Sequence, residues 1–169
     1  MKWSKLQSLV ESRFAPAVQG RVAIYSTTYG RSTAGHAWIE LDKRVLANFD
    51  TQAFCKSRPF LIGKDGNYVV DQDGKAKVGP IPDWANTKKY DNQPVEYGEL
   101  SRQDVYEACW AFVHDLTVDE ALASQNPILQ SLAVLDARLG KRRLNHLNSD
   151  SLHPLAAQLL QVRVQGEDI

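Results

Sequence analysis

The stretch RVAIYSTTYGRSTAGHAWIELDKRVLANF, residues 21–49, decides the fold. Its first part alternates, so that Val22 and Ile24 face one way while Tyr25 faces the other. A period of two with β-branched and aromatic residues is typical of a strand with one buried face. The polar run 30–35 then indicates a loop.

The second half of the stretch predicts a hairpin. Residues 36–41 alternate again, and Asp42-Lys43 predicts a tight turn into a third strand over 45–49. We therefore expect a small antiparallel sheet, built from residues 21–80, with one face covered by a helix. The other face of the second strand carries His36, Trp38 and Glu40.

Apolar stripes at helical spacing flank this region. Near the N-terminus, Trp3, Leu6 and Val10 fall on one helix face, and Pro16 and Gly20 end that helix. The last third contains start signals for several helices: capping boxes at 101–104 and 117–120, Asn126-Pro127, and Pro154. The stripe of residues 128–139 predicts a helix that ends at Gly140.

These elements predict an α+β fold. An N-terminal helix packs on a small antiparallel sheet, and a C-terminal helical subdomain follows. We expect one domain over 1–169, with the helix and β-rich part in 1–98 and the helical part in 99–169. Between them, 60–62 and 68–70 are strand candidates, Asp65-Gly66 and Asp73-Gly74 are turn signals, and 79–98 is a long connecting loop.

Composition narrows the class of protein. Lys and Arg number 20, as do Asp and Glu, so the chain lacks the strong positive charge of a general nucleic-acid-binding protein, and nucleic acid is an unlikely partner. Two separated cysteines do not suit a secreted disulfide framework. The N-terminus has no apolar signal segment, and no run is long enough to span a membrane. We expect a cytoplasmic protein.

The segment 136–143 is the most distinctive feature, and we call it the cationic segment. Its charged residues are a candidate binding site for an anion or a charged protein partner: Asp136, Arg138, Lys141, Arg142 and Arg143. The alternative is structural, because cations at a helix C-terminus neutralise its free carbonyl groups and Asp136 can pair with one arginine. The sequence favours the structural interpretation.

A second candidate is a pocket on the sheet lined by His36, Trp38 and Glu40, with Cys55 nearby; an ordinary polar sheet face is the alternative. Cys109 lies on an apolar stripe and is predicted to be core. His153 is predicted to cap the last helix. No metal-binding spacing, phosphate-binding glycine loop or dinucleotide fingerprint occurs, so we expect no metal and no cofactor.

Several motifs carry a resemblance to a known family. They are KWSKL (2–6), LVESRF (9–14), GRV (20–22), NPIL (126–129), LDARLGKRRL (135–144) and HPL (153–155). The chain resembles a family of small, uncharacterised bacterial cytoplasmic proteins over most of its length. That resemblance implies a single bacterial domain and brings no activity, cofactor or catalytic residue with it.

Two functions follow from these observations. The first is a non-enzymatic binding or regulatory protein that uses the cationic segment as a helix-end surface, since no catalytic constellation is evident. The second is a small enzyme with a site between the sheet and the 79–98 loop, using His36, Glu40 or Cys55. Neither the substrate nor the oligomeric state follows from the sequence.

Overall fold

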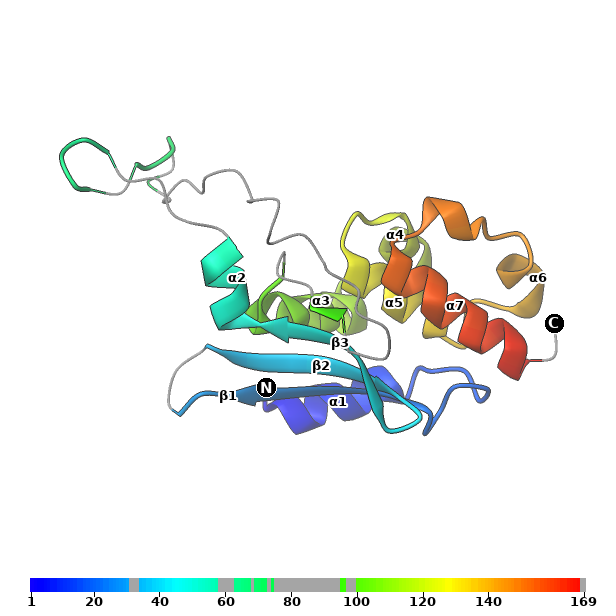
Figure 1. Ribbon diagram of the computed structural model, residues 1–169. Coiled ribbons are helices and arrows are strands. Elements are labelled where there is room, and N and C mark those ends of the chain that lie inside the picture. The colour runs from blue at the N-terminus through cyan, green and yellow to red at the C-terminus, as the bar shows by residue number, and fades with distance from the viewer. Residues whose placement is uncertain are drawn as a thin grey trace.

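The computed structural model describes residues 1–30, 34–57, 63–67, 69–72, 74, 95–96 and 100–167 (Figure 1). It has the α+β fold that the sequence predicts. In chain order the elements are α1 (Trp3–Glu11), β1 (Val22–Thr28), β2 (Gly35–Leu41), β3 (Arg44–Asp50), α2 (Thr51–Ser57), β4 (Val95–Glu96), α3 (Arg102–His114), α4 (Val118–Ala123), α5 (Pro127–Leu135), α6 (Lys141–Leu144), the 3-10 helix η2 (Ser149–Ser151) and α7 (Pro154–Gly166).

The sheet has the order β1-β2-β3-β4. Its first three strands are antiparallel neighbours, as predicted, and Tyr25 of β1 lies opposite Trp38 of β2. Two elements differ from the prediction. β4 pairs parallel to β3 and comes from residues 95–96, inside the predicted 79–98 loop, and helix α2 directly follows β3. Most of that loop, the strand predicted over 60–62, residue 68 and Asp73 lie outside the described residues.

The β2–β3 hairpin closes through Asp42-Lys43, as predicted. Both residues have positive φ, 50° and 67°, which is the conformation that a two-residue turn needs to match the twist of its strands. Arg21, at the start of β1, forms an ion pair with Asp42 at 2.9 Å. The turn therefore fixes the register that places alternate β2 residues on opposite faces of the sheet.

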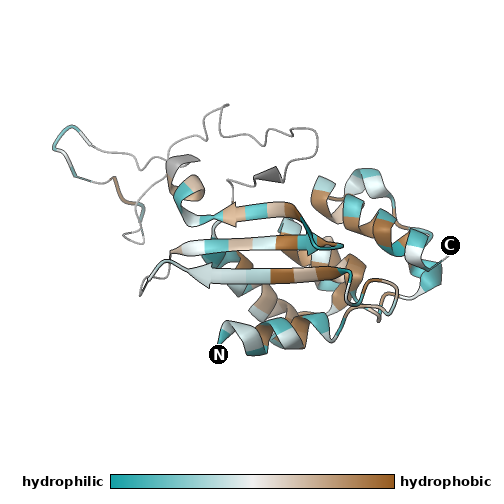
Figure 2. Cartoon of the chain, turned by 60° about the horizontal axis from the view of Figure 1, so that its bottom comes forward, coloured by the Kyte–Doolittle hydropathy of each residue, from teal (hydrophilic) through white to brown (hydrophobic). Residues whose placement is uncertain are grey.

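One face of the sheet belongs to the core. Ile24, Ile39 and Phe49 point to this face and are at most 1% exposed. Helix α1 packs on β1 and lies below the strands in Figure 2, and α3 packs on β2 and β3. Buried side chains of the sheet, α1, α3, α5 and α7 form one apolar cluster.

The helical part begins where its capping signals predict. Ser101 and Thr117 each form a capping box, and Asn126 accepts hydrogen bonds from the N–H groups at the start of α5. Every residue of α5 is buried, because α3, α4 and α7 surround it. His153 caps α7, as predicted, by accepting a hydrogen bond from the Leu155 N–H at 3.2 Å.

The predicted end of α5 was wrong. The helix stops at Leu135, and Gly140 is the residue before α6 rather than the stop of α5. Helix α1 also ends earlier than predicted, at Glu11 rather than at Pro16. The segment that follows α1 explains the early end of α5. There, residues 13–15 pair with 135–137: the Ala15 N–H binds the Leu135 carbonyl and the Ala137 N–H binds the Arg13 carbonyl, both at 2.8 Å. This tertiary pairing replaces the next helical turn.

Candidate functional site

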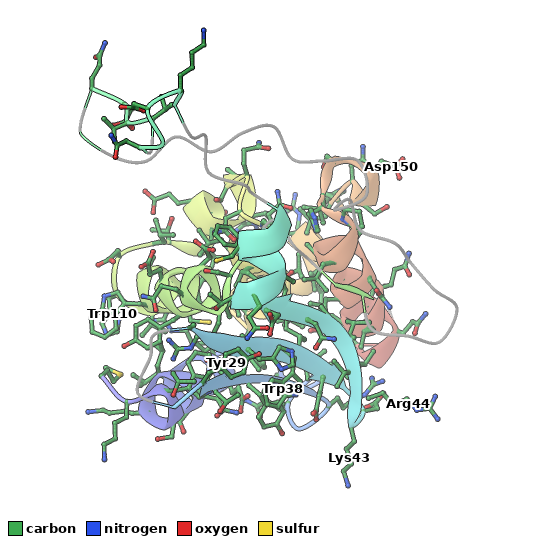
Figure 3. The ribbon with its side chains drawn as sticks, turned by 60° about the vertical axis from the view of Figure 1, so that its left-hand side comes forward. Tyr29, Trp38, Lys43, Arg44, Trp110 and Asp150 are labelled. Atoms are coloured by element: carbon green, nitrogen blue, oxygen red, sulfur yellow. The ribbon has the colours of Figure 1, made fainter. Side chains whose placement is uncertain are left out.

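The face of the sheet opposite the core carries an aromatic row. Trp38 stacks with Tyr25 at 5.2 Å between ring centroids and with His36 at 5.0 Å. The three rings come from neighbouring strands and share this face because strand residues alternate. All three side chains are partly exposed. Figure 3 shows Trp38 on the sheet and, from the same region, Tyr29.

Polar groups bracket this row. His36 Nε2 lies 2.8 Å from Asn48 Oδ1, and the Trp38 indole N–H donates to Glu40 Oε1 at 2.9 Å. Because Asn48 Oδ1 can only accept, the His36 Nε2 atom carries a proton. We call the partly exposed set the sheet patch: Tyr25, His36, Trp38, Glu40, Asn48 and Asp50.

Asp50 closes one end of the sheet patch and starts α2. Its Oδ1 accepts from the N–H groups of Gln52 at 2.7 Å and Ala53 at 2.9 Å, and its Oδ2 accepts from the Tyr29 hydroxyl. Burial by itself raises the pKa of Asp50. The hydrogen bonds from Tyr29, Ala53 and Gln52, with a smaller contribution from His36, outweigh it and lower that pKa below its ordinary value. Asp50 is therefore a carboxylate at neutral pH.

The two carboxylates of the sheet patch are bonded to neutral donors. Glu40 accepts from an indole, and Asp50 accepts from a phenol and two backbone amides. Among the described residues, neither forms an ion pair with a cation within 4.0 Å, in contrast to Asp42, Asp119, Asp136 and Glu167. No lysine or arginine of the described residues therefore neutralises the sheet patch, and His36 alone acts on the charge of Asp50.

The structure places the predicted residues of this face together. His36, Trp38 and Glu40 lie on one side of β2, as the alternation predicts, but whether they bind a ligand stays a prediction. Cys55 is exposed on α2 and is not part of a disulfide. A pocket that described residues line lies elsewhere, between α7 and the chain after α1: Pro16, Ala17, Lys141, Gly166 and Glu167.

Sequence reasoning did not name Tyr25, Asn48 and Asp50 as members of the site. A signal existed for each of them. Tyr25 alternates with Val22 and Ile24, and Asn48 and Asp50 alternate with the buried Phe49. Pairing the strands in register would have brought them beside Trp38 and His36.

In the cationic segment, Asp136 and Arg138 form an internal pair. Asp136 is fully buried, and its carboxylate accepts from Arg138 Nε at 3.0 Å and Nη2 at 2.7 Å. It also accepts from the Arg138 backbone N–H at 2.8 Å. The hydrogen bonds to Asp136 raise the pKa of Arg138, with burial acting in the opposite direction. The ion pair that the structural interpretation predicts is therefore present.

Arg163 of α7 is the partner that sequence reasoning missed. Its side chain is almost fully buried, and its guanidinium donates to three carbonyl oxygens within 2.5–2.8 Å: those of Val134, Asp136 and Leu139. Its Nε donates to Glu167 at 2.9 Å. One arginine thereby satisfies the carbonyls left free where α5 stops early. An arginine within an apolar helix stripe gave no sign of this role.

The outer cations of the cationic segment lie on α6, a short helix of their own. The prediction that they gather at the C-terminus of a longer α5 was therefore wrong. Arg143 forms an ion pair with the exposed Asp119, and Lys141 Nζ donates to the Glu167 carbonyl at 2.8 Å. Arg142 is exposed, and no described residue pairs with it.

Other candidate residues have structural partners. Arg13 donates to the Phe112 and Val113 carbonyls, each at 2.7 Å, and so satisfies the C-terminal end of α3. His114 stacks on Trp110 at 4.1 Å, exposed on α3. Cys109 is buried in the core, as predicted, and burial raises the pKa of its thiol to about 12.

Metal-binding clusters and membrane-spanning helices are both absent from the described residues. They contain no cluster of three or more His, Cys, Asp or Glu side chains arranged to hold a metal ion. Among the described helices, none combines the length and apolar composition that a membrane span requires.

Comparison with known proteins identifies the family of this chain. The model of the SF0329 protein family matches residues 2–164, which is nearly the whole chain and spans both the sheet and the helical part. The chain belongs to the SF0329 family. No curated protein and no solved structure matches it.

Proposed function

We propose that this SF0329 protein is a non-enzymatic binding protein and that the sheet patch is its binding surface. The observation that carries the proposal is the aromatic row on the face of the sheet opposite the core, where all three rings are partly exposed. Tryptophan and tyrosine supply most of the energy at many protein interfaces, because they bury a large area with few rotatable bonds.

The polar frame of the row supports the same proposal. Trp38 is held by Glu40, and His36 is held by Asn48, so these side chains are oriented before a partner arrives. A surface that is already ordered loses less side-chain entropy on binding. The rims of binding surfaces are polar in the same way.

The cationic segment is a second candidate binding surface. Lys141, Arg142 and Arg143 are exposed on α6, and Arg142 has no partner among the described residues, which favours contact with an anionic partner. Its weakness is that Arg138, Arg143 and Lys141 already contact other groups of the protein. For this reason we rank it below the sheet patch.

A small enzyme is the alternative function, with a site between the sheet and residues 79–98. The proximity of His36 to Asp50 favours it, because an imidazole facing a carboxylate is a common acid–base arrangement. Most of the 79–98 segment lies outside the described residues. A His36→Gln variant that keeps the full function of the wild type in cells would count against catalysis.

We also propose that the protein works in the bacterial cytoplasm. Both thiols are free: Cys109 is buried and Cys55 is exposed. An exposed free cysteine suits a reducing compartment better than an oxidising one.

Partner capture followed by direct binding tests the main proposal. Wild-type protein and a Tyr25→Ser/Trp38→Ser variant are used to capture partners from cell extract, and captured candidates are purified and titrated by calorimetry. We expect the variant to bind at least tenfold more weakly, since it lacks both large rings of the row.

An Arg142→Ala/Arg143→Ala variant is the matched control. It removes two exposed cations from α6 and leaves the sheet unchanged, so binding through the sheet patch should be unaffected. If this control loses the partner while the sheet variant retains it, α6 is the binding surface and the proposal for the sheet patch is wrong.

A further inference from the structure

We infer that the sheet patch recognises a positively charged side chain of a protein partner, an arginine or a lysine. The inference depends on the proposed binding function and goes beyond it by stating the chemistry of the partner. The charges of the sheet patch are negative. Glu40 and Asp50 are carboxylates on the exposed face, and their hydrogen-bond partners are all uncharged.

Several other acidic residues, in contrast, form ion pairs with a cation of the same chain. Asp42 pairs with Arg21, Asp119 with Arg143, and Asp136 with Arg138. Lys43 and Arg44 are the cations nearest to Glu40 along the chain, at the β2–β3 turn. They extend from the turn away from Trp38 in Figure 3, and neither is within ion-pair distance of Glu40. No lysine or arginine among the described residues pairs with the sheet patch, so its charge is complementary to a cation that a partner would supply.

The rings between the two carboxylates favour the same ligand. Tyr25 and Trp38 are partly exposed aromatic rings, and aromatic rings attract guanidinium and ammonium groups. A guanidinium can donate to a carboxylate and contact a ring at once, because it is planar and carries five N–H donors. A phosphate or another anion would be repelled by Glu40 and Asp50.

Nuclear magnetic resonance with short peptides tests the inference. The probes are a capped pentapeptide with two arginines, the same peptide with citrulline in their place, and the same with glutamate. The readout is the indole N–H signal of Trp38, one of four tryptophans, assigned with a Trp38→Phe variant. We expect saturable shifts with the arginine peptide and an apparent Kd at least tenfold lower than with citrulline.

A charge-only variant makes the test specific. Glu40→Gln/Asp50→Asn removes both negative charges while keeping oxygen acceptors for the Trp38 indole and the α2 amides. We expect it to bind the arginine peptide at least tenfold more weakly and the citrulline peptide unchanged. Glu107→Gln, an exposed carboxylate on α3, is the matched control and should bind as wild type. If the double variant unfolds, Glu40→Gln alone should weaken binding at least threefold.

Three results would overturn the inference. They are equal affinity for arginine and citrulline, unchanged binding by the charge variant, or no shift of Trp38 with the arginine peptide. A Trp38 shift that depends on protein concentration alone would replace the cationic partner by a second copy of the chain. If one of these results is found but a captured partner still requires Tyr25 and Trp38 for binding, the proposed binding function is retained. Only the inference of a positively charged partner side chain is then wrong.

Discussion

The buried region around Arg163 and the exposed sheet patch use polar groups in opposite ways. Around Arg163, every charged group has a partner within the fold. The Arg163 guanidinium binds three carbonyl oxygens and Glu167, and the Asp136 carboxylate binds Arg138. In the sheet patch, Glu40 and Asp50 meet neutral donors only. The polar groups of the first region are satisfied within the fold, whereas the carboxylates of the second can still pair with a cation of a partner.

This difference separates structural from functional polar residues. A buried charge without its partner is costly, so a network like that of Arg163 is needed for stability. A half-exposed carboxylate is hydrated by water and costs little to leave without a cation. Substitutions should therefore lower the free energy of unfolding strongly in the first region and only slightly in the second.

The largest effect is expected for Arg163→Ala. Four acceptors in or near the core would lose their donor, and breaking a buried charge pair costs about 3–5 kcal/mol. Chemical denaturation followed by circular dichroism measures the free energy of unfolding. Gln161→Ala, an exposed change on the same helix, is the control and should stay close to wild type. Equal stability of the two variants would contradict the closed network.

The next effect separates two arginines of the cationic segment. Arg138→Ala leaves the fully buried Asp136 with one backbone donor, so we expect a loss of about 1–3 kcal/mol in the free energy of unfolding. Arg142→Ala should change it by less than about 0.5 kcal/mol, because Arg142 is exposed. Denaturation of both variants measures the difference. Comparable losses would show that Asp136 does not need Arg138.

A smaller effect is expected in the sheet patch. Trp38→Ala removes two stacking contacts across a half-exposed face, and we expect a loss of about 1 kcal/mol with the fold retained. Thermal unfolding measures this loss, and the dispersion of amide signals reports the fold. A loss as large as that of Arg163→Ala would mean that the row is part of the core rather than a surface.

The smallest effect is a pH dependence at Asp50. Its pKa is lower in the fold than the ordinary 3.8, so the unfolded chain takes up this proton first as the pH falls. Its contribution is present near pH 7 and is lost as the pH falls through the folded pKa. Asp50→Asn keeps the helix cap. We expect the free energy of unfolding of the wild type to exceed that of the variant by roughly 0.5 kcal/mol at pH 7, and this difference to shrink as the pH falls below 3.8. A constant difference would contradict the shift.

Local patterns were enough to predict much of the fold. The period of two placed His36 and Trp38 on one face of β2, and Asp42-Lys43 fixed the turn. The capping boxes fixed the starts of α3 and α4. Each of these features depends on residues close in sequence. The early stop of α5 could not be predicted, because it depends on pairing with residues 13–15, more than 100 positions away.

The candidate site was predictable in part for the same reason. The members on β2 follow from alternation, whereas Tyr25, Asn48 and Asp50 join them only through the strand register. Arg163 gave no signal, because its carbonyl partners lie 24 to 29 residues before it and carbonyls are common to all residues. The SF0329 match covers all these parts at once and does not separate the surface residues from the structural ones.

The position of Arg163 has a consequence for how the chain matures during synthesis. The carbonyls of Val134, Asp136 and Leu139 are made before their donor, so water must hold them until α7 leaves the ribosome. A chain that ends before Arg163 would leave these three carbonyls with water as their donor and would lose the contacts that join the α5–α6 junction to α7. We therefore expect the helical part to become fully stable only once the last helix is in place.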